Sequence, residues 1–221
     1  RSAPLPTGGT LEQADGTAWM AFYCQCMVEI ALVLADEDPR YEEEAFKFLQ
    51  HFMWIAYAMD RIGDQHDEMW DEKDGFFYDV LRLPDGSAVR LKVRSMVGLL
   101  PLCASTIFEP DAVVAHPRLL ELIRLFRERH PEVVAHVAPT GDGYVGHGGR
   151  RLLSPLSREK LERVLRYLVD ESEFLGPFGI RSRRGFDETV DQGSRVHRPH
   201  IAPPARERQM RTGSTQVRNG T

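Results

Sequence analysis

A long apolar stretch near the beginning of the chain decides its fold: residues 15–36 read DGTAWMAFYCQCMVEIALVLAD. Large apolar side chains recur within it at spacings of four, four, three and four, at Trp19, Tyr23, Met27, Ile30 and Leu34. This spacing places them in one stripe along an α-helix about 30 Å long. We therefore predict an amphipathic helix from about Asp15 to Asp36, with this stripe as its apolar face.

The next apolar stretch predicts a second helix that packs against the first. Asp38 can cap this helix and Pro39 can occupy its first turn, and the apolar stripe continues to about Asp60. Because only a few residues connect the two helices, they must be antiparallel neighbours.

The period of the apolar residues changes after a polar loop. Residues 76–83 and 88–94 alternate apolar with polar around Pro84-Asp85-Gly86-Ser87, which predicts a β-hairpin. Further helices are predicted over residues 95–108, 117–129 and 157–170, while 131–150 shows no clear period. Large apolar residues are scarce beyond Ser182. We therefore predict a folded part over 1–182 and a basic tail over 183–221 that is disordered or frame-altered.

The composition is that of a soluble globular protein, with 42% apolar and 28% charged residues among 221. Residues 181–221 hold nine Arg against four acids, whereas residues 1–180 hold 19 bases against 29 acids. An acidic body repels phosphate backbones, so we expect no nucleic-acid binding.

Polar residues interrupt the apolar runs, so no membrane segment is expected. Three cysteines cannot all pair, which favours reduced thiols in a cytoplasmic protein.

The start of the first helix carries the most informative polar side chains. A Gly-rich segment, residues 7–10, leads directly into Gln13, Asp15 and Trp19. Functional sites are often built on loops that run into a scaffold helix. A carboxylate beside an aromatic residue is common in carbohydrate sites, because aromatic faces stack on sugar rings. The acidic residues with such a neighbour are Asp15, Glu12, Asp71 and Asp79.

A purely structural interpretation of the same residues stays open. Asp15 can cap the first helix, Asp71 and Asp74 can shape a turn, and Trp19 and Trp70 can belong to the core. No motif predicts a metal or a cofactor: residues 71–75 lack the alternating acids of a calcium loop, and residues 146–150 lack the Lys-Ser/Thr of a phosphate-binding loop. We expect neither a metal nor a cofactor.

Four motifs, taken in order, resemble the catalytic domain of glycoside hydrolase family 63. They are RSAPLPTGG with LEQADGTAWMA in residues 1–21, WDE with DGFFYD in 70–79, LKVRSMVGL in 91–99 and FLGPFGIRS in 174–182. The resemblance covers residues 1–182. It implies a mainly α fold, part of an (α/α)6 toroid of twelve helices built of antiparallel helical hairpins, and an activity of inverting hydrolysis on α-glucosides or α-mannosides.

The resemblance also implies which residues line a sugar-binding subsite: Gln13, Asp15, Trp19, Tyr78 and Arg94. Asp15 would accept hydrogen bonds from sugar hydroxyls, Trp19 and Tyr78 would offer stacking surfaces, and Arg94 would anchor a hydroxyl or carboxylate. Inversion needs a carboxylic acid and a carboxylate base. In the family pattern these lie before Arg1 and beyond Ser182, so we expect a fragment that carries neither catalytic residue.

Two other functions fit the same scaffold. One is a non-catalytic carbohydrate-binding or interaction protein. The other is a sugar epimerase on the same toroid, which would need His residues at the toroid centre. The positions of His51, His66 and His147 do not suggest such a cluster.

Overall fold

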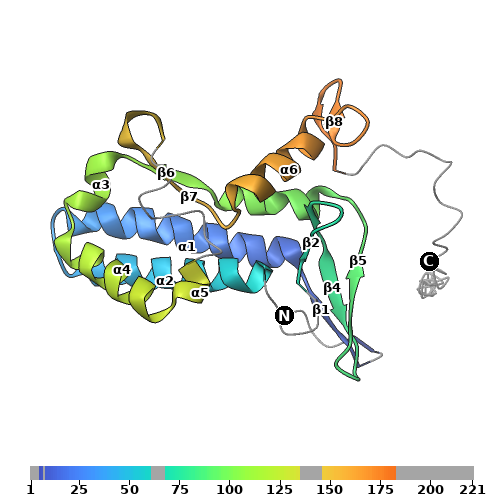
Figure 1. The fold of residues 1–221 in the computed structure, drawn as a ribbon, viewed down its shortest axis with the longest axis horizontal. Coiled ribbons are helices and arrows are strands. Elements are labelled where there is room, and N and C mark those ends of the chain that lie inside the picture. The colour runs from blue at the N-terminus through green and yellow to red at the C-terminus, as the bar shows by residue number, and fades with distance from the viewer. Residues whose placement is uncertain (1–4, 7, 61–67, 135–145, 183–221) are drawn as a thin grey trace, which may run out of the picture. The chain divides into compact units, whose positions relative to one another are not determined.

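The computed structural model describes residues 5–6, 8–60, 68–134 and 146–182, and these residues fold mainly into helices (Figure 1). The α-helices of this part are α1 (Ala14–Ala35), α2 (Tyr41–Asp60), α3 (Pro110–Val114), α4 (Pro117–Arg129), α5 (Pro131–Val134) and α6 (Arg158–Leu168). The 3-10 helices are η1 (Met96–Ala104) and η2 (His147–Gly149). The strands are β1 (Thr10–Glu12), β2 (Trp70–Asp71), β3 (Phe76–Phe77), β4 (Asp79–Arg82), β5 (Ala88–Leu91), β6 (Thr106–Phe108), β7 (Arg151–Leu153), β8 (Leu175–Gly176) and β9 (Gly179–Ile180). The mainly α fold class is confirmed.

Helices α1 and α2 form an antiparallel pair that organises the fold (Figure 1). Both helices were predicted, and their observed bounds differ from the predictions by two residues or fewer at each end. They bury mainly small side chains against each other, among them Ala21 on α1 and Ala45 and Ala56 on α2. Small residues allow a close approach of the two helix axes. Phe52 and Leu49 of α2 fill the remaining space in this core.

The face of α1 that packs into the core is not the predicted stripe. Trp19, Tyr23, Ile30 and Leu34 are exposed, whereas the buried positions are Ala14, Ala18, Ala21, Cys24, Gln25, Val28, Ala31, Leu32 and Ala35. The stripe prediction was wrong because α1 is apolar on both faces, and periodicity alone cannot choose between two apolar faces. The face of small residues fits against α2 and η1, so the large side chains stay outside.

Helix α1 is also long and apolar enough to cross a membrane by length and composition. Its charged residues are Asp15 and Glu29, fewer than the sequence argument against membrane segments assumed. About 44% of this apolar stretch is buried inside the protein, and a single helix of this kind near the N-terminus is weak evidence for a membrane span. Length and apolarity alone therefore do not place α1 in a membrane.

The predicted β-hairpin is confirmed over a shorter range as the β4–β5 pair, with Asp79 opposite Leu91 and Arg82 opposite Ala88. Phe76 and Phe77, which were predicted to belong to its first strand, pair with β2 instead. Gly86 takes a φ of 86° in the connecting turn, a conformation that suits glycine. Strand β1 adds to the other side of β4, with Glu12 opposite Val80. This pairing brings the segment before α1 beside the segment that carries Tyr78 and Asp79.

Residues 95–108 form the predicted helix only in part, and as a 3-10 helix. They form η1 and then β6, which pairs with β7. Pro101 lies inside η1, and proline removes a backbone donor and clashes with the preceding turn of an α-helix. Gly98 lets η1 approach β3 so closely that a Cβ atom there would lie 2.2 Å from Phe76 Cε1. Apolar spacing predicted the helix, and these two residues changed its form.

Two apolar cores support the described part of the chain. One joins α1, α2, α4 and β7, and the other surrounds Trp70, Phe76, Phe77 and Phe174 beneath η1 and α6. The predicted helices over 117–129 and 157–170 are confirmed as α4 and α6. The predictions for the tail beyond Ser182 fall outside the described residues.

Candidate functional site

The N-terminus of α1 is held by a carboxylate from another element. Asp79, at the start of β4, accepts a hydrogen bond from the Ala14 amide at 2.8 Å. The first amides of a helix have no partner within the helix, so Asp79 satisfies one of them. Burial raises the pKa of Asp79; the Ala14 amide opposes this shift and the nearby Asp15 carboxylate adds to it. The carboxylates of Asp79 and Asp15 therefore lie near each other at the N-terminus of α1, directly after Gln13.

Asp15 and Trp19 lie one turn apart on α1, and Tyr23 follows one turn further. Residues four apart share a helix face, so a carboxylate and two aromatic rings form one surface. Trp19 is 53% exposed and its ring contacts Phe22 edge-on, with the centroids 5.8 Å apart. This surface offers a hydrogen-bond acceptor beside accessible aromatic faces, which is the chemistry expected for binding a sugar ring.

Tyr78 and Arg94 lie in a second, buried group. Tyr78 is only 2% exposed, its hydroxyl donates to the Asp74 carboxylate at 3.0 Å, and Lys92 lies over its ring. Burial raises the pKa of Tyr78 to about 12, although the neighbouring Arg94 guanidinium favours the phenolate. The ring faces of Tyr78 are covered in this structure, and its predicted stacking role stays a prediction.

Arg94 joins the end of the hairpin to the loop after α6. Its guanidinium pairs with Glu173 at 2.5 Å and lies over the Tyr167 ring, 4.4 Å from the centroid. Arg94 Nε is buried and has no hydrogen-bond partner in the described part of the chain. The sequence interpretation did not find Glu173, because no local pattern links it to a position 79 residues earlier.

The segment 71–75 forms the turn that the sequence predicted. The Asp71 carboxylate accepts a hydrogen bond from the Asp74 amide at 2.8 Å, and the Asp71 carbonyl accepts one from Gly75. Lys92 and Arg90 also pair with Asp71. Although burial acts to raise the pKa of Asp71, these partners hold it below its usual value. Asp71 is therefore an ionised structural residue.

The five predicted site residues thus fall into two groups. Gln13, Asp15 and Trp19 lie on and before α1 beside Asp79, while Tyr78 and Arg94 lie with Asp74 and Glu173. Successive side chains of an extended segment point to opposite faces, which separates Tyr78 from Asp79. Between the two groups, the described residues form no hydrogen bond, ion pair or ring contact that would join them directly.

The other candidate carboxylate, Glu12, has a structural partner. It pairs with Arg82 at 3.1 Å across the β1–β4 ladder. In the described ranges, no three His, Cys, Asp or Glu side chains gather closely enough to hold a metal ion.

The comparisons with known proteins give one informative relative. The chain is 42% identical over 200 residues to the uncharacterized protein YMR196W of Saccharomyces cerevisiae, and the match covers 85% of this chain. The chain spans 18% of the length of that yeast protein. No family model matches the chain, and no solved structure matches it.

Proposed function

We propose that this chain is part of the catalytic domain of an inverting α-glycoside hydrolase of the family 63 type, acting on α-glucosides or α-mannosides. In this proposal the chain contributes α1 and its neighbours to an (α/α)6 toroid. It supplies part of the sugar-binding subsite, and the two catalytic carboxylates lie in other parts of the complete protein.

The observation that carries the proposal is the exposed apolar face of α1. Trp19, Tyr23, Ile30 and Val33 are all more than half exposed, although the opposite face of the same helix is fully packed. A helix that is apolar all round belongs between two layers of neighbours. A toroid of helical hairpins would supply the second layer. The greater length of the yeast relative is consistent with a protein that contains further helices.

Asp15, Gln13 and Trp19 support the carbohydrate part of the proposal. They lie at the N-terminal end of α1 or directly before it, where the Asp15 carboxylate can accept hydrogen bonds from sugar hydroxyls. The ring of Trp19 can stack on the apolar face of a pyranose. Asp79 accepts the Ala14 amide in the first turn of α1 and so stabilises the end of the helix that carries Asp15 and Trp19.

Calorimetric titration of the chain with glucose, mannose and short α-glucosides tests the proposed subsite. We expect weak binding that Asp15→Ala and Trp19→Ala each abolish. Suitable controls are Asp111→Ala and Phe178→Ala, which remove an exposed acid and a fully exposed aromatic ring elsewhere. If the folded chain binds none of these sugars, or if the controls weaken binding as much as the subsite variants, the proposed subsite is wrong.

The same face supports a second candidate function, that of a non-catalytic interaction protein. Ile30 and Val33 lie toward the far end of α1 from Asp15, and exposed apolar surface of this kind commonly marks a protein interface. Under this alternative, Ile30→Lys and Val33→Lys abolish association with a partner, while Asp15→Ala has no effect on it. Under the hydrolase proposal, the two lysine variants leave sugar binding by the chain unchanged.

A further inference from the structure

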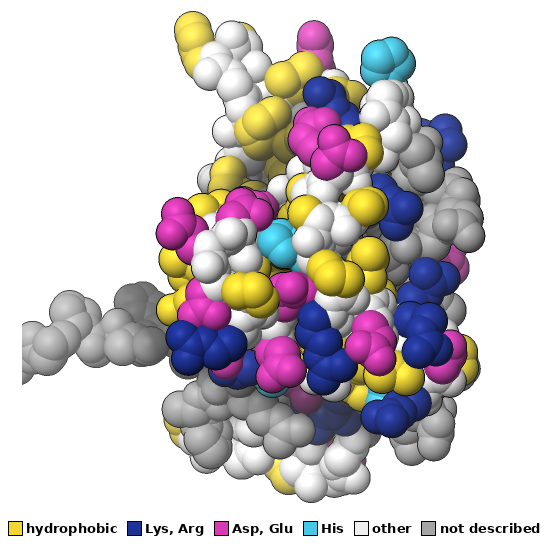
Figure 2. All heavy atoms as spheres, turned by 90° about the vertical axis from the view of Figure 1, so that its left-hand side faces the viewer, with side chains coloured by type: hydrophobic (Ala, Val, Ile, Leu, Met, Phe, Trp, Pro, Cys, Tyr) yellow, Lys and Arg dark blue, Asp and Glu magenta, His cyan; other side chains and the backbone are white. Residues whose placement is uncertain are grey.

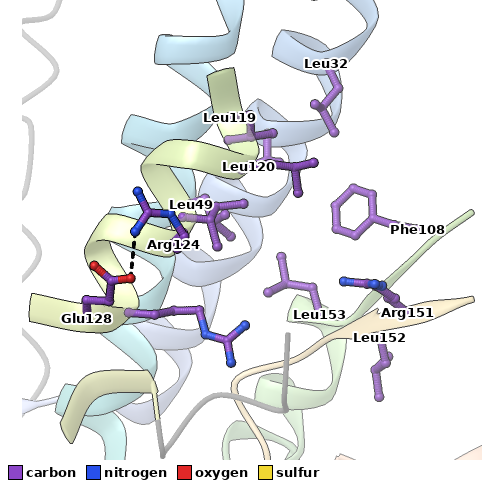
Figure 3. A pocket seen from close by; sticks show the side chains of 13 residues that line it. Leu32, Leu49, Phe108, Leu119, Leu120, Arg124, Glu128, Arg151, Leu152 and Leu153 are labelled. Carbon is purple, nitrogen blue, oxygen red and sulfur yellow. Dashed lines mark hydrogen bonds and ion pairs between the residues drawn. The ribbon is translucent and has the colours of Figure 1, made fainter. Parts of the chain in front are cut away.

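A pocket of about 480 Å³ lies between the helical pair and the β6–β7 ribbon (Figure 3), and none of the candidate sugar-subsite residues lines it. Its walls are mostly aliphatic. They come from α1, α2, α4 and the ribbon, and include Leu32, Leu49, Leu119, Ile123 and Leu153. Its size lies in the range of about 300–1,000 Å³ that is typical of small-molecule sites.

The charged groups of the pocket are predominantly basic. Three arginines and a single glutamate line it: Arg124, Arg127, Arg151 and Glu128. Arg124 pairs with Glu128 at 2.7 Å, and Arg127 also has a partner. On the face of the protein that Figure 2 shows, acidic and basic side chains are interspersed. Arg118 of α4, for example, pairs with Glu121.

Arg151 differs from these arginines. It lies on β7 opposite Phe108 and is half-buried, yet its guanidinium forms no hydrogen bond or ion pair with any residue that the structure describes. The adjacent Arg150 is exposed and pairs with Glu109 at 3.0 Å. The Arg151 side chain points into the pocket (Figure 3), where a guanidinium without a protein partner can pair with an anion. Arg151 therefore leaves an anion-binding group at an aliphatic wall.

A ligand that satisfies both features must be an amphiphile with one acidic group. A carboxylate or phosphate can accept two parallel hydrogen bonds from a guanidinium. The attached aliphatic chain would cover Leu120, Ile123 and Leu152, the aliphatic lining residues of the pocket that are only partly buried. A neutral apolar ligand would leave Arg151 without a partner, and a small polar anion would leave Leu120 and Ile123 uncovered.

We propose that this pocket binds an aliphatic-chain acid, with its acidic group on Arg151 and its chain along Leu120, Leu153 and Ile123. This inference goes beyond the proposed glycoside hydrolysis. It does not depend on that function, since no residue of the proposed sugar subsite lines the pocket.

Calorimetric titration of the folded chain with decanoate, decyl phosphate, decan-1-ol and hexanoate tests the ligand class. We expect decanoate to bind at least roughly tenfold more tightly than decan-1-ol, because the alcohol lacks the charge-assisted hydrogen bonds. Each methylene that contacts the pocket should tighten binding by about fourfold, so hexanoate should bind much more weakly. The relative affinity of decanoate and decyl phosphate then distinguishes a carboxylate from a phosphate ligand.

Two substitutions and one matched control locate the binding. Arg151→Gln should remove the preference for decanoate over decan-1-ol. Leu120→Asn, at a position that is already 37% exposed, should weaken both ligands without unfolding the chain. Arg150→Gln removes an adjacent arginine outside the pocket and should leave binding unchanged.

Three results would overturn the proposal. They are no binding of decanoate by the folded wild-type chain, equal affinities for decanoate and decan-1-ol, and an Arg151→Gln variant that still prefers the acid. Thermal unfolding of each variant, followed by circular dichroism, verifies that a loss of binding is not a loss of fold.

Discussion

The contact between η1 and β3 yields a sharp test of the fold around Tyr78. A Cβ atom on Gly98 would lie 2.2 Å from Phe76 Cε1 and 2.3 Å from the Phe77 carbonyl oxygen. The Phe77 oxygen belongs to the backbone and cannot rotate away, and Phe76 is fully buried in a stack with Phe174. Gly98→Ala must therefore push η1 and β3 apart.

Overpacking of this kind costs about 1–3 kcal/mol, and the backbone clash places Gly98→Ala near the upper end. For a chain of this size, that corresponds to a fall in Tm of roughly 6–12 °C. Urea unfolding followed by circular dichroism gives the change in free energy. Gly16→Ala is the matched control, because its Cβ would meet only Gln13 Cβ at 3.7 Å. In α1 it should stabilise the chain by up to about 1 kcal/mol.

The same variant should change the environment of Tyr78, which directly follows Phe77. Loosening this core admits water, so the pKa of Tyr78 should fall from about 12 toward the ordinary value of a tyrosine. An ultraviolet titration of Gly98→Ala, compared with Gly98→Ala/Tyr78→Phe, isolates this residue. If Gly98→Ala is as stable as the wild type and its Tyr78 titrates unchanged, η1 does not approach β3 as described.

Three further predictions concern charge and burial. Arg94→Met should cost about 3 kcal/mol by leaving the Glu173 charge buried, and Arg94→Met/Glu173→Met should recover part of this loss in urea unfolding. The pKa of Asp79 is higher in the folded state than in the unfolded state, where it is about 3.9. Its stabilising contribution is therefore fully present below about pH 3.9 and is lost as the pH rises through the raised folded-state pKa. Asp79→Asn should gain more stability, relative to the wild type, at neutral pH than in acid, as urea unfolding at the two pH values would show. Val33→Lys, at a position that is 69% exposed, should change stability by less than about 0.5 kcal/mol, whereas Ala21→Val should cost about 1–3 kcal/mol; thermal unfolding of both variants tests this contrast.

Local patterns predicted several elements correctly. The helices α1, α2, α4 and α6 follow from apolar spacing and from proline positions, and the β4–β5 hairpin follows from alternation around Pro84-Asp85-Gly86-Ser87. The turn at Asp71 was also predictable, because its acidic and glycine residues favour turns in any context. Each of these features depends on residues that are close together in the chain.

Long-range packing determined the features that the sequence interpretation missed. Pro101 and the contact of Gly98 with Phe76 changed the helix predicted over residues 95–108 into η1 and β6. The pairing of Arg94 with Glu173 joins positions 79 residues apart, and neither neighbourhood contains a signal for the other.

Helix α1 shows most clearly where local information ends. Its sequence is sufficient to predict a long helix, because the spacing of its apolar residues depends only on residues within a few turns of one another. Which face is buried depends on the partners: the alanine face fits α2 and η1 closely, and the face of Trp19, Tyr23 and Ile30 does not. Apolar periodicity shows only which faces of a helix favour burial. The shape of the neighbouring helices decides which of these faces is buried.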